Sequence, residues 1–157
     1  MKTRALRHVV LLTLFATVVA AGLAAAQSAM KPMSGDVVAD RQRLMKLNGA
    51  NWADAQAKFK AGNIEGIAVN AETIAVMVSH IPVLFPQGSG TQASYAKPEV
   101  WEKWQEFSAD DKNAEMWAEK LRDAARSKDA AATETVMKEF GPKACGTCHT
   151  PFRRPKS

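Results

Sequence analysis

Residues 143–153 read KACGTCHTPFR, and this stretch contains both cysteines of the chain, Cys145 and Cys148. The cysteines lie three positions apart, and His149 directly follows the second one. Such a CxxCH stretch can form a disulfide, contribute to a zinc site, act as a redox dithiol or attach a haem. Each of these chemistries needs different partners elsewhere in the chain.

Three of the four interpretations fit the sequence poorly. A structural zinc site needs four ligands, and the chain has no further cysteine to contribute. A thioredoxin-type pair begins a helix after a strand, whereas this pair ends a helical segment. A disulfide between residues three apart on a helix closes a very small loop and is strained.

The haem interpretation uses every residue of the motif. Cys145 and Cys148 project from one helical face, so each can form a thioether bond to one vinyl group. His149 is four residues after Cys145, and its imidazole can reach the iron. The stretch therefore predicts one covalently bound haem c per chain, with His149 as an axial ligand.

The first 26 residues have the pattern of a secretory signal peptide. Three basic residues precede an apolar run over residues 9–19, and alanines at 24–26 form a small-residue end. We expect cleavage near Ala26, which leaves residues 27–157 as one mature domain in the periplasm. A membrane anchor is the weaker interpretation, because the apolar run is short for a full span. Export also places the two cysteines in an oxidising compartment.

The charge balance gives no basis for nucleic-acid binding. The chain has 21 Lys and Arg against 16 Asp and Glu, a formal net charge of +5. Cleavage removes three basic and no acidic residues, so 18 remain against 16, a formal charge of +2. A near-neutral chain lacks the basic surface that nucleic acids require. No later apolar run reaches membrane length, so we expect no stable membrane insertion after processing.

The mature chain is predicted to be all-α, an antiparallel four-helix bundle. Apolar residues recur at spacings of three and four in residues 36–61, 69–84, 98–126 and from 130 into the cysteine tail. Residues 60–66 and 127–129 are predicted turns, and residues 85–98 are the longest loop. Amphipathic helices joined mostly by short connections are typical of such a bundle.

Several residues predict interruptions of these helices. Pro82 should kink or close the second helix, and Pro142 should kink the fourth just before the cysteines. The polar cluster at residues 108–111 is predicted to bend the third helix. Pro151 lacks the N–H that would bond to Thr147, so we expect the last turn to break at Thr150.

Taken together, these features resemble the class II cytochromes c, which include cytochrome c′ and its methionine-ligated, low-spin relatives. The resemblance rests on RQRLMKLNG at 41–49, LFPQGSG at 84–90, PEVW at 98–101 and KACGTCHTPFR at 143–153. It covers most of the mature domain. The C-terminal position of CxxCH, with RQxxM upstream, favours this class over other haem proteins. Cytochrome c′ is itself a well-known four-helix bundle.

The resemblance implies roles for four further residues. Met45 faces the iron from the side opposite His149, and Arg41 binds the haem propionates. Arg153 has a supporting role near the haem, and Trp101 lines the pocket. Arginine suits a propionate because its planar guanidinium can form two parallel hydrogen bonds to a carboxylate. His80 is expected to be exposed or capped rather than a ligand.

Met45 divides the functional predictions. If its thioether binds the iron, both axial positions are filled, and the protein is an electron carrier for redox partner proteins rather than an enzyme. If Met45 is a flexible core residue, the iron is open to small gases such as NO or CO. A catalytic site such as a peroxidase ranks last, because no acid–base set is visible near Met45. We predict the carrier, with gas binding as the alternative, and the resemblance also allows a homodimer.

Overall fold

The computed structural model describes residues 34–155. α2 (Val37–Lys60) and α3 (Ile67–Ser79) form an antiparallel pair, followed by a single turn of 3-10 helix, η1 (Pro82–Leu84). A loop then leads to α4 (Glu99–Glu102) and α5 (Trp104–Arg126). The last helical segment consists of α6 (Ala130–Phe140), η2 (Gly141–Gly146) and α7 (Thr147–Phe152).

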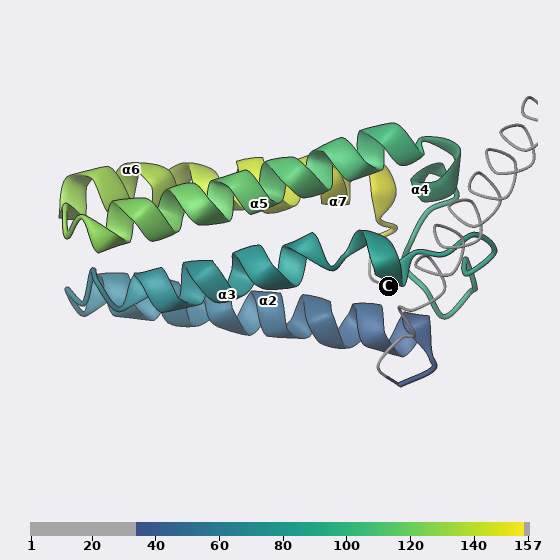
Figure 1. Ribbon diagram of the computed structural model, residues 1–157, viewed down its shortest axis with the longest axis horizontal. Helices are drawn as coiled ribbons and strands as arrows, with labels where there is room; N and C mark the ends of the chain where they lie inside the picture. Colours follow the sequence, from purple (N-terminus) through teal and green to yellow (C-terminus); the bar gives the residue numbers. More distant parts are fainter. Residues whose placement is uncertain (1–33, 156–157) are drawn as a thin grey trace, which may run out of the picture. The chain divides into compact units, whose positions relative to one another are not determined.

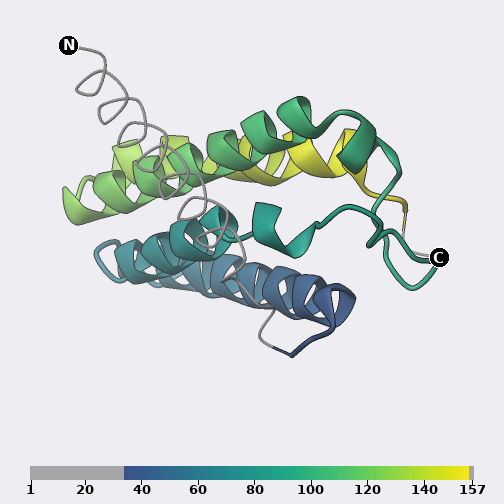
Figure 2. The ribbon, with the colours of Figure 1, turned by 45° about the vertical axis from the view of Figure 1, so that its right-hand side comes forward.

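The helices form two layers of a four-helix bundle. Figure 1 shows α2 and α3 in one layer, and α5 beside α6 and α7 in the other. Figure 2 shows the chain after α7 running beside the loop that follows η1. In the described part of the chain, the single extended pairing is an isolated bridge between Ala96 and Arg153. The predicted signal peptide, 1–26, lies outside the described residues.

Side-chain caps fix where two of the helices begin. The carboxylate of Asp36 accepts hydrogen bonds from the N–H groups of Val38 (2.9 Å) and Ala39 (3.1 Å) at the start of α2. Asp129, the last residue of the predicted turn 127–129, accepts one from the N–H of Ala132 (3.0 Å) and caps α6. No helix within residues 34–155 combines the length and apolar character that crossing a membrane requires.

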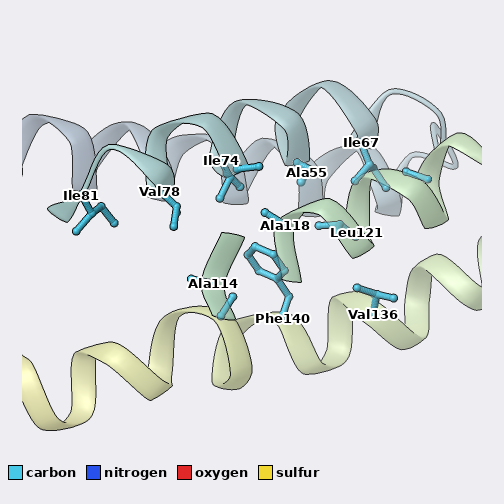
Figure 3. Close-up of a cluster of buried hydrophobic side chains, with 14 of the residues drawn as sticks. Ala55, Ile67, Ile74, Val78, Ile81, Ala114, Ala118, Leu121, Val136 and Phe140 are labelled. Atoms are coloured by element: carbon cyan, nitrogen blue, oxygen red, sulfur yellow. The ribbon is translucent and has the colours of Figure 1, made fainter. Parts of the chain in front are cut away.

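The core lies between α3, α5 and α6 (Figure 3). Ile67, Ile74 and Val78 of α3 face Ala118 and Leu121 of α5, and all five are at most 5% exposed. Burying a side chain the size of leucine or isoleucine stabilises the fold by about 1.5–3 kcal/mol. Buried alanines on both helices let their backbones pack closely.

The third predicted helix is interrupted, but not at the polar cluster. α5 runs without a break through residues 108–111, so the predicted bend there is wrong. Phe107, Asp111 and Ala114 are all buried and keep the helical spacing of four and three through this cluster. The break lies at Lys103, whose backbone (φ −117°, ψ 46°) leaves the helical region and separates α4 from α5.

Pro82 closes the second helix, as predicted. α3 ends at Ser79, five residues before the predicted end, and starts at Ile67, two residues before the predicted start. Proline clashes with the carbonyl four residues earlier, so an α-helix cannot continue through Pro82 without distortion. The chain continues instead as the 3-10 turn of η1.

The two prolines of the C-terminal segment have different effects. Pro142 lies in η2, a π-helical stretch whose wider turn accommodates the proline ring without ending the segment. Pro151 does not break the last turn, so the predicted break at Thr150 is wrong and α7 continues to Phe152. Proline there removes a single bond to Thr147. Burial of Phe152, 3% exposed and 5.4 Å from the ring of Phe107, offsets that loss.

Candidate functional site

A cavity of about 610 Å³ opens between the two layers of the bundle. Most of its lining is aliphatic or aromatic, contributed by α2, α3, α5, α6 and α7. Trp52 of α2 and Phe140 of α6 stack with ring centroids 4.6 Å apart, and both line the cavity. Such a mostly apolar cavity with few polar groups is typical of a cofactor site.

The motif residues Cys145, Cys148 and His149 all line this cavity. Cys145 lies on η2, and the other two lie on α7, so the π-helical stretch carries the motif into α7. Burial raises the pKa of both thiols. The pKa of Cys148 reaches about 12, with the carboxyl groups of Asp110 and Asp111 adding to the effect.

The raised pKa values do not favour a redox dithiol. A reactive cysteine needs a lowered pKa, and these two thiols have raised ones. They are not joined in a disulfide. Within residues 34–155, no group of three or more His, Cys, Asp and Glu side chains is arranged to hold a metal ion.

Met45 reaches the cavity from the other layer of the bundle. It lies on α2, whereas His149 lies on α7, and these two helices belong to different layers (Figure 1). Both residues line the cavity. Met45 is half-buried and packs against the core. The structure thus brings the two predicted axial ligands to one cavity from different layers.

Arg41 is a buried cation one turn before Met45. It is 5% exposed and donates hydrogen bonds to the carbonyls of Leu84 and Ser89 and to the hydroxyls of Ser89 and Ser94. Its guanidinium carbon lies 4.1 Å from the ring centroid of Phe85. Burial lowers the pKa of Arg41 to about 10, and the carboxylate of Asp36 partly offsets this.

These bonds give Arg41 a role that the sequence did not reveal. Its four hydrogen bonds all go to neutral oxygens of residues 84–94, and they use four of its five N–H groups. Arg41 therefore ties the loop after η1 to α2. It also lines the cavity, where an anionic group would balance its buried charge.

Trp101 does not line the cavity, contrary to the expectation from sequence. Its indole N–H donates to the carbonyls of Phe85 (3.1 Å) and Pro86 (3.0 Å), and its ring lies 6.2 Å from that of Phe85. The one-turn helix α4 holds it there. Trp101 thus packs one layer behind the wall and supports Phe85, which does line the cavity.

Arg153 lines the cavity from the segment after α7. Its backbone is extended (φ −119°, ψ 133°), and its N–H donates to the carbonyl of His149 (3.1 Å). The side chain is exposed. His80 is not part of the cavity lining, and its Nδ1 lies 2.7 Å from the carbonyl oxygen of Val76 at the end of α3, as expected.

The site residues named from the sequence omit two polar residues of the cavity, Asp111 and Asn48, although Asn48 lies on the apolar stripe of residues 36–61. Each has a buried side-chain oxygen with no hydrogen-bond partner among the described residues. Burial raises the pKa of Asp111 to about 7, the carboxylate of Glu115 adds to this, and Lys112 opposes it. A polar residue on the apolar stripe of α5 was the available signal, but the polar cluster at 108–111 masked it.

The residues of the cavity fit a covalently bound haem. Two thiols three residues apart can form thioether bonds, and an imidazole and a thioether offer axial ligands from different layers. The apolar walls suit the porphyrin. The buried guanidinium of Arg41 suits its carboxylates, because a buried cation needs a negative partner.

Comparisons with known proteins agree with this assignment. The model of the family described as cytochrome C′ matches residues 36–153. Cytochrome c′ of Pararhodospirillum photometricum is 36% identical over 117 residues, which cover 72% of this chain and 92% of the relative. Cytochrome c-554 of Cereibacter sphaeroides is 36% identical over 114 residues, 71% of each chain.

Solved structures show the same fold at lower identity. Cytochrome c′ from Rubrivivax gelatinosus superposes with a TM-score of 0.67 at 24% identity, over 80% of this chain and 98% of that one. A nitric oxide complex of a cytochrome c prime mutant from Alcaligenes xylosoxidans gives a TM-score of 0.69 at 22% identity. The match covers 77% of this chain and 95% of that one.

Proposed function

The chain belongs to the cytochrome c′ family, whose members carry one covalently bound haem c per chain, and we propose that it is a one-electron carrier with His149 and Met45 as axial ligands. Haem c supplies a reversible one-electron iron couple when bound. We propose that the protein exchanges single electrons with redox partner proteins and does not transform a substrate.

The position of Met45 carries this proposal. A methionine thioether on α2 lines the same cavity as His149 on α7. A thioether is a neutral, soft ligand that raises the reduction potential of haem iron. With both axial positions taken by the chain's own side chains, no position is left for substrate or gas.

The remaining site residues hold and shield the cofactor in this proposal. Cys145 and Cys148 fix it through thioether bonds. Arg41 and Arg153 are proposed to interact with its propionates, one buried and one exposed at the cavity. Trp101 acts indirectly by supporting Phe85. The apolar walls keep water away from the iron, which lowers the reorganisation that accompanies electron transfer.

Export fits this role. We propose that residues 1–26 direct the chain to the periplasm and are removed near Ala26, so that residues 27–157 form the mature carrier. A solved neighbour is described as a cytochrome c′ with ligand-controlled dimer dissociation. We therefore propose that the present chain forms a homodimer, which analytical ultracentrifugation can test.

Replacing Met45 by alanine tests the proposal. Met45→Ala removes the thioether, so the ferric protein should change from essentially all low-spin to essentially all high-spin, and its potential should fall. Optical and paramagnetic resonance spectra measure the first change and a redox titration the second. Leu44→Ala is the matched control, because Leu44 packs against the core but does not line the cavity. An unchanged low-spin spectrum in Met45→Ala would exclude Met45 as the ligand.

A second candidate function is the binding of a small gas such as nitric oxide. It is favoured by the nitric oxide complex among the solved structures that share the fold. In this case Met45 is a core residue beside a five-coordinate iron, and its apolar side chain limits the size of the gas that binds. Met45→Ala should then leave the protein high-spin and increase its rate of CO binding.

A further inference from the structure

Asp111 is an acidic side chain inside the haem cavity. It lies on α5, is 5% exposed and lines the cavity. Its Oδ1 is buried and has no hydrogen-bond partner among the described residues. An unpaired buried carboxylate is unfavourable by several kcal/mol, so the group either takes up a proton or needs a partner.

The surroundings of Asp111 leave its charge largely uncompensated. On α5, the negative charge of Glu115 disfavours the ionised form of Asp111, and the positive charge of Lys112 favours it. From α7 the thiol of Cys148 interacts with it, and this thiol would become an uncharged thioether once haem is attached. Cys145 of η2 and His149 of α7 line the same cavity. The cavity residues contributed by α3 and α6 are apolar, and so is Val100, which α4 contributes.

The other charged or titratable groups of the cavity belong to α2 and to the segments around it. They are Arg41, Lys46, Tyr95 and Arg153. The hydrogen bonds of Arg41 go to residues 84–94, and Lys46, Tyr95 and Arg153 are exposed and therefore solvated. No ion pair of Asp111 with any of the four is found among the described residues.

We propose that Asp111 takes up one proton when the protein accepts its electron and releases it when the electron leaves. The inference rests on the proposed one-electron function, but it does not depend on the identity of the second axial ligand. The electron comes from a one-electron donor protein and the proton from solvent. The electron would be held by the bound haem, while the Asp111 carboxylate would take up the proton and become a carboxylic acid. Loss of the electron would return the acid to the carboxylate and release the proton to solvent.

The physical reason is the low dielectric of the cavity. An added electron places one more negative charge in a space that Asp111 also lines, and this disfavours the carboxylate. The burial that raises its pKa to about 7 brings this change into the range of neutral pH. Linkage is reciprocal, so a group that binds its proton more tightly in the reduced protein makes the reduction potential fall as pH rises.

The test compares the reduction potential of the haem-loaded protein from pH 5 to 9 in three forms. In the unaltered protein the potential should fall with rising pH around neutrality, with a roughly tenfold or greater difference in proton affinity between the two redox states. Asp111→Asn should lose this component, and Asp111→Glu should keep it at a shifted pH. Glu119→Gln is the control and should behave like the unaltered protein, because Glu119 is an exposed carboxylate of the same helix outside the cavity lining.

A second measurement uses the unaltered protein alone, in case a variant fails to fold. Reduction in weakly buffered solution with a pH-indicator dye should show proton uptake near pH 7, and an infrared difference spectrum should show a carboxylic acid band in the reduced form. Identical pH dependence in Asp111→Asn and the unaltered protein would overturn the inference, as would absence of proton uptake. A haem that cannot be cycled reversibly by one electron would instead overturn the proposed function.

Discussion

Replacing Cys145 and Cys148 together by serine is expected to lower covalently attached haem from one per chain to none. Each thiol supplies one of the two thioether bonds, and the described part of the chain has no other cysteine to replace them. Each single variant should keep one bond. Acid–acetone extraction followed by mass spectrometry distinguishes the forms, since covalent haem stays with the protein and adds its mass.

The double variant should also be less stable than the unaltered protein. Without attached haem the cavity of about 610 Å³ lacks the group that fills its apolar walls, and a ligand that binds the folded state alone stabilises it. Thr147→Ser is the matched control, because it alters a residue between the cysteines and keeps the hydroxyl that bonds to Lys143. Haem that survives extraction in the double variant would contradict the assignment of the motif.

Replacing Arg41 by methionine is expected to lower the free energy of unfolding by about 3 kcal/mol. The substitution removes a buried cation that donates to residues 84–94, and hydrogen bonds to charged groups contribute roughly 1.5–3 kcal/mol each, with the acceptors left unpaired. Urea denaturation of the haem-loaded protein, followed by circular dichroism, measures the change.

Arg126→Met is the control for this prediction. Its side chain is 59% exposed and forms a surface ion pair with Glu72 at 3.4 Å. Surface pairs contribute little, so the change should stay within about 1 kcal/mol. If Arg41→Met is no more destabilising than Arg126→Met, Arg41 does not hold the loop to α2 in solution.

The helices and the haem anchor could be predicted from sequence because their signals are local. Spacings of three and four indicate amphipathic helices whatever the rest of the chain does, and CxxCH needs five consecutive residues. Three of the four residues named from the family resemblance line the same cavity, namely Arg41, Met45 and Arg153. Their roles toward the haem stay predictions.

The features in which the structure differs from the sequence predictions depend on packing between segments that are far apart in the chain. The break at Lys103 accompanies the contact of Trp101 with residues 85–86, which α4 reaches only in the folded bundle. Pro151 is tolerated because Phe152 is buried against Phe107, a contact forty-five residues away in the chain. Helix propensities describe the hydrogen bond that a proline removes locally. They do not include the stabilising contacts between segments that are far apart in the chain.

Asp111 illustrates the same limit at the site. In the sequence it belongs to a polar cluster, and a cluster of this kind normally marks an exposed surface or a bend. In the structure it occupies the buried stripe of α5, where Phe107 precedes it and Ala114 follows. Its position on the helix could be read from the sequence, but only the structure shows that Oδ1 is buried with no hydrogen-bond partner among residues 34–155.

The central claim is that His149 and Met45 close both axial positions of the iron. The most direct measurement is the optical spectrum of the unaltered protein in its ferric and ferrous forms, with and without CO. With both positions filled, the spectra should be low-spin in both forms, and the ferrous spectrum should not change under CO. A high-spin ferrous spectrum that shifts when CO is added would contradict it and would establish an open, gas-binding iron.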